Sequence, residues 1–124
     1  MADPERIGLI RRLLGEALSY MEKGDAVQSS EKLYKATEEC VKALSERFGL
    51  EEVKAAEEKG RWTVRLLEKA IGKLVDKLSV DVEIGWDAAN YLHIWVFHET
   101  RLDVEDVKRR VPFIKRLIEL TEEA

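Results

Sequence analysis

An all-α fold is predicted: an antiparallel up-down bundle of four to five helices, forming a single domain over residues 1–124. Two observations predict it. Apolar residues recur every three or four positions along most of the chain, and no alternating strand pattern of useful length interrupts them. The composition agrees, because 45% apolar residues with only two prolines and a net charge of -4 exclude an intrinsically disordered chain.

The first two helices are expected at residues 4–23 and 26–49. Asp3 and Asp25 are capping residues placed directly before each apolar pattern, and Gly24 ends the first one. Both patterns have the spacing of an amphipathic helix with one buried side. The inward positions are Ile7, Ile10, Leu14, Ala17, Leu18 and Met21 in the first helix, and Ala26, Leu33, Thr37, Cys40, Leu44 and Phe48 in the second.

The second half of the chain predicts three more helices. Residues 50–60 are mostly Glu, Lys and Ala, which indicates a connector with a short, weakly held helical piece. A third helix follows at 62–78 and a fourth at about 81–101. Asp103 caps a fifth helix, which should kink or restart at Pro112 because proline removes a backbone donor and crowds the preceding turn. The inward positions are Leu67, Ala70, Ile71, Leu74 and Leu78, then Val104, Val107, Val111, Ile114, Ile118 and Thr121.

The fourth predicted helix is unusual, because residues 86–99 are apolar around most of the helix circumference and include both histidines. A helix with so wide an apolar surface must be buried on more than one side. The second side can meet either a fifth helix or another copy of the chain, and we expect a homodimer. The uncharged stretch 88–98 is about half as long as a membrane crossing requires, so no membrane insertion is expected.

A site composed across such a dimer is the enzymatic alternative. Tyr91, His98, Glu99 and Arg101 would form it, with histidine as acid or base and arginine stabilising phosphate charge. The simpler interpretation places Glu99 near solvent at the helix end and His93 in a packed position, satisfied by a backbone carbonyl or a neighbouring chain.

No metal or other cofactor is expected. His93 and His98 are five residues apart, which on an α-helix separates them by about 140°, whereas ligands from one helix prefer a spacing of three or four. Cys40 is at an inward position and is expected in the core. The tryptophans are most simply packing residues, with a stacking platform for bases as the alternative. They are Trp62, Trp86 and Trp95.

Charge gives little indication of a nucleic-acid partner, because the pI is near 5.3. A basic stripe at 108–110 and 115–116 is expected to be a solvated face, neutralised by the pairs Glu105 with Arg109 and Asp106 with Arg110. Many charges with one asparagine and one glutamine are typical of a protein from a hot environment. A single cysteine and an N-terminus without a secretory signal favour a cytoplasmic location.

Residues 91–99 and 102–107 resemble the archaeal PaREP family, a paralogous group found in hyperthermophiles. Residues 24–36 and 60–62 are similar to the same family, so the resemblance extends over most of the chain. Val96 stands where the family has a glycine. The resemblance implies a helical bundle similar to that of the HEPN superfamily, which includes nucleotidyltransferase-associated modules and metal-independent ribonucleases.

The HEPN ribonucleases carry an arginine separated from a histidine by four to six residues. For His93 that arginine would be at 86–88 and for His98 at 91–93, and none of these residues is arginine. We therefore expect a non-catalytic, homodimeric interaction module that binds a macromolecular partner or a nucleotide-like ligand. The resemblance implies a nucleotidyltransferase as the protein partner, and an RNA-processing enzyme with the composite dimer site is the alternative.

Overall fold

A computed structural model describes residues 3–124, and within that range every regular element is helical, as predicted. It contains six α-helices rather than four to five, because the 50–60 connector folds into a helix of its own. The elements are α1 (Pro4–Glu22), α2 (Ala26–Arg47), α3 (Glu51–Lys59), α4 (Val64–Lys77), α5 (Asp81–Leu92), the π-helix η1 (His93–His98) and α6 (Val104–Glu123). No helix in this part of the chain is long and apolar enough to cross a membrane.

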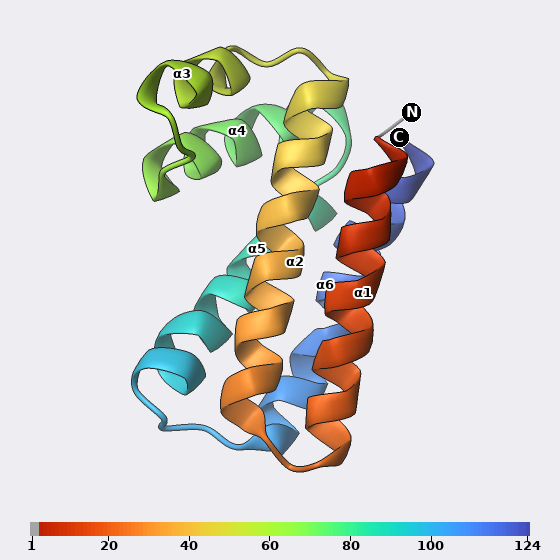
Figure 1. Ribbon diagram of the computed structural model, residues 1–124, viewed down its shortest axis with the longest axis vertical. Helices are drawn as coiled ribbons and strands as arrows, with labels where there is room; N and C mark the ends of the chain where they lie inside the picture. Colours follow the sequence, from red (N-terminus) through yellow and green to blue (C-terminus); the bar gives the residue numbers. More distant parts are fainter. Residues whose placement is uncertain (1–2) are drawn as a thin grey trace.

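The helices α1, α2, α5 and α6 run alongside one another, while α3 and α4 lie across one end (Figure 1). The α2 helix is central, since it contacts every other helical element. Buried side chains from α1, α2, α4, α5, η1 and α6 form one hydrophobic cluster. Most of the predicted inward positions are in it, including Ile10, Leu33, Leu74 and Ile114.

The helix starts follow the predicted caps. The carboxylates of Asp3 and Asp25 accept hydrogen bonds from the backbone N–H groups of Glu5 and Gln28, respectively. Asp103 forms a reciprocal capping box with the third residue of α6. Each cap satisfies backbone donors that have no partner within the helix.

The α6 helix is continuous through Pro112, so the expected restart does not occur. Pro112 is on the exposed side of the helix, where solvent is available to the carbonyl that loses its donor. Val107 and Val111 before it, and Ile114 and Ile118 after it, are all buried on one side. Burial of that continuous apolar side outweighs the local cost of proline.

The short helix α3 is fastened by an ion pair. Glu52 is 6% exposed, and its carboxylate lies 2.9 Å from Lys73 Nζ of α4. Leu50 and Ala56 are buried beside it. These contacts are nonlocal, which is why the local sequence pattern indicated only a weak helical piece.

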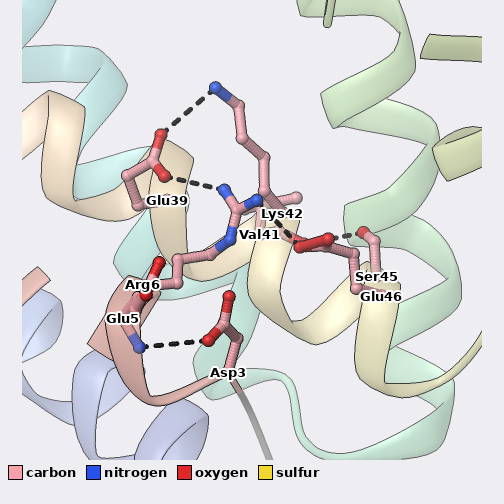
Figure 2. Close-up of polar contacts among 8 residues, drawn as sticks. All are labelled: Asp3, Glu5, Arg6, Glu39, Val41, Lys42, Ser45 and Glu46. Carbon is pink, nitrogen blue, oxygen red and sulfur yellow. Dashed lines mark hydrogen bonds and ion pairs between the residues drawn. The ribbon is translucent and has the colours of Figure 1, made fainter. Parts of the chain in front are cut away.

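A second ion-pair group joins α1 to α2. Figure 2 shows the guanidinium of Arg6 reaching between Glu39 and Glu46, at 2.7 and 2.9 Å. Lys42 also pairs with Glu39, at 3.2 Å. Both terminal nitrogens of Arg6 are therefore paired with carboxylates. We interpret this group as a structural contact that stabilises the packing of α1 against α2.

Cys40 is fully buried, as expected, and burial raises the pKa of its thiol from 9.0 to about 12. In the unfolded chain the thiol ionises above pH 9, whereas in the folded chain it stays neutral up to a higher pH. The stability that comes from burying the neutral thiol is therefore fully present below pH 9 and is lost as pH rises. At pH 10 the loss is on the order of 1 kcal/mol. Burial also raises the pKa of Tyr34 to about 12, which adds a loss above pH 10.

We therefore expect the free energy of unfolding to fall between pH 7 and pH 10, and to fall less in Cys40→Ala by an amount on the order of 1 kcal/mol. Urea unfolding followed by circular dichroism at both pH values measures the two differences. Comparing each protein with itself removes the packing cost of the substitution. Equal pH dependence in the two proteins would contradict the assignment to Cys40.

Candidate functional site

The predicted fourth helix changes geometry at His93. The α5 helix ends at Leu92 and continues as the π-helix η1, in which the N–H of Glu99 donates to the carbonyl of Ile94 five residues earlier, at 3.0 Å. The expected α-helix up to Arg101 is therefore wrong from His93 onwards. The wider turn keeps Val96 fully buried while His93 contacts α2.

The π-helix brings the two histidines together. His93 Nε2 and His98 Nε2 are 3.0 Å apart, and the ring centroids are 4.4 Å apart with the rings near perpendicular. The separation of 140° expected for an α-helix is wrong, because five residues make about one full turn where hydrogen bonds span five residues. The expected backbone partner of His93 is also missing among the described residues, since its buried Nδ1 has no hydrogen bond.

Aromatic rings hold His93 in place. Its ring stacks on Tyr34 of α2 at 3.9 Å between centroids and on Phe97 at 5.5 Å, within 10° of parallel in both cases. Burial, and then the neighbouring His98, lower the pKa of His93, while Glu31 opposes the shift. His98 itself is exposed. The pair therefore consists of one fixed imidazole that favours its neutral form and one accessible imidazole.

The four residues of the predicted composite site are all exposed, and Glu99 is at the helix end as expected. No hydrogen bond or ion pair within residues 3–124 joins any two of them. Tyr91 instead lies under the guanidinium of Arg110, 4.2 Å from its ring centroid, and His98 contacts His93. One chain by itself does not assemble these groups into a site. The four residues are Tyr91, His98, Glu99 and Arg101.

The tryptophans differ in their environments. Trp86 is 1% exposed and is a packing residue, as expected, whereas Trp95 is 43% exposed and its ring centroid lies 6.4 Å from that of Tyr91. Trp95 belongs to a group of large apolar side chains that are 41–48% exposed, which we call the α5–α6 apolar face. It consists of Ile84, Tyr91, Ile94, Trp95 and Phe113.

The basic stripe on α6 is a solvated ion-pair surface, as expected, although its partners differ. Lys108 pairs with Glu105 at 3.3 Å, and Arg109 pairs with Asp106 at 3.6 Å, at a spacing of three rather than four. Arg110 does not pair with the Asp106 carboxylate. It donates to that residue's backbone carbonyl instead. This surface is largely neutralised, which agrees with the low pI.

Sequence reasoning missed Tyr34, Phe97 and Arg110 as neighbours of the candidate residues. A spacing of five between the two histidines is the spacing of a π-helix, and it was the signal available for their contact. No group of three or more His, Cys, Asp or Glu side chains in residues 3–124 is arranged to hold a metal ion.

Comparison with known proteins identifies the family to which this chain belongs. The model of the archaeal PaREP1/PaREP8 family matches residues 5–118. A crystal structure of a protein from Sulfolobus solfataricus is 33% identical, with a TM-score of 0.85 over 93% of this chain and 94% of that one. A solution structure of the Orf c02003 protein is 34% identical, with a TM-score of 0.79 over 91% and 88%. No curated protein matches. The chain therefore belongs to the archaeal PaREP1/PaREP8 family.

Proposed function

We propose that this protein is a non-catalytic interaction module that forms a homodimer through the α5–α6 apolar face. The observation that carries the proposal is the exposure of five large apolar side chains, two on α5, two on η1 and one on α6, of which α5 contacts both of the others. Contiguous apolar surface rimmed by polar residues is typical of protein interfaces, and aromatic side chains are enriched there. Three of the five residues are aromatic.

Charges around this face favour a second copy as the partner. Helical spacing places Glu83 and Asp87 on the outer edge of α5, and Arg109 beyond Phe113 on the outer edge of α6, where Arg109 also makes its 3.6 Å pair with Asp106. A two-fold axis through the face would set the acidic edge of one copy against the basic edge of the other. Burial and repulsion from Glu83 and Glu68 raise the pKa of Asp87, so an approaching arginine would relieve this acidic cluster.

Phe113→Asp is expected to convert the dimer into a monomer at micromolar concentration, because it places a charge within the apolar face. Light scattering measures the molar mass. Val64→Asp is the matched control: Val64 is 59% exposed on α4, outside the face, so the dimer should persist. A wild-type monomer across micromolar concentrations, or a Phe113→Asp dimer, would contradict the proposal.

The module is proposed to act by binding another macromolecule or a nucleotide-like ligand. The resemblance of its bundle to the HEPN superfamily favours a nucleotidyltransferase as the partner class. An RNA-processing enzyme would require two copies to bring Tyr91, His98, Glu99 and Arg101 together, because within residues 3–124 of one chain no hydrogen bond or ion pair joins any two of them. For this reason we favour the module.

RNA incubated with the purified protein is therefore expected to remain intact, as gel electrophoresis would record. If the wild type cleaves RNA and His98→Ala does not, while the helical circular dichroism signal is kept, the protein is an RNA-processing enzyme and the proposal of a non-catalytic module is wrong. The wild type and His98→Ala are purified identically, so that both would carry the same contaminants. Cleavage of equal strength in both proteins would then indicate a contaminating nuclease.

A further inference from the structure

We propose that His93 and His98 form a binding site for a transition-metal ion of the Cu²⁺, Ni²⁺ or Zn²⁺ class, one ion per chain. These are the only two histidines in the sequence, and η1 places their Nε2 atoms 3.0 Å apart. The proposal is independent of the homodimer, since both ligands come from the same chain. It goes beyond the interaction module, which requires no metal.

The nitrogen–nitrogen distance fits two ligands of one ion. Zinc binds imidazole nitrogen at about 2.0–2.1 Å, so two ligands of a tetrahedral ion are about 3.3 Å apart. Two neighbouring ligands of a square-planar Cu²⁺ or Ni²⁺ ion with similar bond lengths are about 2.9 Å apart. The observed 3.0 Å lies between these values. The two Nε2 atoms are at hydrogen-bond distance, so an ion would replace that hydrogen bond and one ring would rotate to turn both lone pairs toward the ion.

The surroundings divide the roles of the two ligands. The His93 ring stacks on Tyr34 and on Phe97, and these contacts fix its orientation. Little conformational entropy therefore remains to be lost when His93 binds an ion. His98 is exposed and free to make the rotation, and solvent reaches its side of the pair. The site is thus half preorganised and half adjustable.

The donor set selects the metal class. Two imidazole nitrogens suit Cu²⁺, Ni²⁺ and Zn²⁺, whereas Mg²⁺ and Ca²⁺ prefer oxygen ligands. No third His, Cys, Asp or Glu in residues 3–124 completes the set, so water fills the remaining positions. Such an ion keeps open coordination positions, as a ligand-binding or catalytic metal does and a closed structural zinc does not. The Irving–Williams order predicts tighter binding of Cu²⁺ than of Zn²⁺.

Isothermal titration of the full chain with CuCl₂ and with ZnCl₂ tests the proposal. We expect saturation at one ion per chain, with the tighter binding for Cu²⁺. His93→Phe keeps an aromatic ring between Tyr34 and Phe97, and His98→Ala changes an exposed side chain. Each variant is expected to weaken Cu²⁺ binding by at least about tenfold.

Two controls separate the metal site from other effects. Glu58→Gln removes an exposed carboxylate of α3 and should bind Cu²⁺ as the wild type does. Phe113→Asp should lose the dimer and keep the metal, so failure of one proposal is distinguishable from failure of the other. The metal site is wrong if binding does not saturate, or if His93→Phe and His98→Ala bind Cu²⁺ as tightly as the wild type. NMR supplies a second readout, because Zn²⁺ should shift the ring-proton signals of both histidines.

Discussion

Trp86→Ala is expected to lower the free energy of unfolding by about 3–5 kcal/mol, the range for truncating a large buried aromatic side chain. Trp86 is 1% exposed and is among the largest fully buried side chains of the protein. Its ring lies 5.9 Å from that of Tyr34 in α2, and its indole N–H donates to the Glu68 carboxylate of α4. The side chain thus joins α2, α4 and α5, and alanine would leave a cavity among all three.

Trp86→Phe separates the packing contribution from the hydrogen bond. Phenylalanine removes the indole donor and part of the fused ring, and its own ring fills most of the cavity. Because Glu68 is exposed, water can replace that donor, and the expected loss is about 1 kcal/mol. Urea unfolding followed by circular dichroism measures both variants. A loss below about 1 kcal/mol in Trp86→Ala would show that the three helices repack around the smaller side chain.

The fold was predictable from local signals. Asp3, Asp25 and Asp103 each precede an apolar periodicity, and a side-chain cap needs nothing beyond the next few residues. The family resemblance, now confirmed over residues 5–118, rests on the same sequence runs. The sequence predicted only a short, weakly held helical piece where α3 forms, because the Glu52–Lys73 ion pair that stabilises this helix joins residues that are far apart in the sequence.

The candidate site was predictable only in part. The wide apolar surface of the fourth helix correctly indicated exposed apolar side chains such as Ile94. Phe113 was missed, because the side of α6 that meets α5 depends on how the two helices pack. The His93–His98 contact was missed because 100° per residue was assumed throughout, and that assumption fails within η1. The stacking partner Tyr34 belongs to another helix, which no local pattern identifies.

Gly85→Val is expected to destabilise the fold by about 3 kcal/mol, and Gly85→Ala by about 1–3 kcal/mol, through overpacking. A β-carbon at Gly85 would lie 2.8 Å from Leu117 Cβ and 2.9 Å from the carbonyl oxygen of Phe113. Both atoms are close to the backbone of α6 and cannot move aside as the end of a flexible side chain can. The two helices must separate to admit even one methyl group.

The matched control is Gly72→Ala in α4, where a β-carbon meets nothing within 4 Å. The same chemical change should there stabilise the protein by about 0.5–1 kcal/mol, because alanine favours helix more than glycine does. Urea unfolding measures the change in the free energy of unfolding for both variants. A decrease for Gly85→Ala and an increase for Gly72→Ala would separate the effect of helix–helix contact from that of helix propensity. Equal effects would contradict the close approach of α5 and α6. Because the backbone that must move carries Phe113, Gly85→Ala should also weaken the proposed dimer, which links this contact to the α5–α6 apolar face.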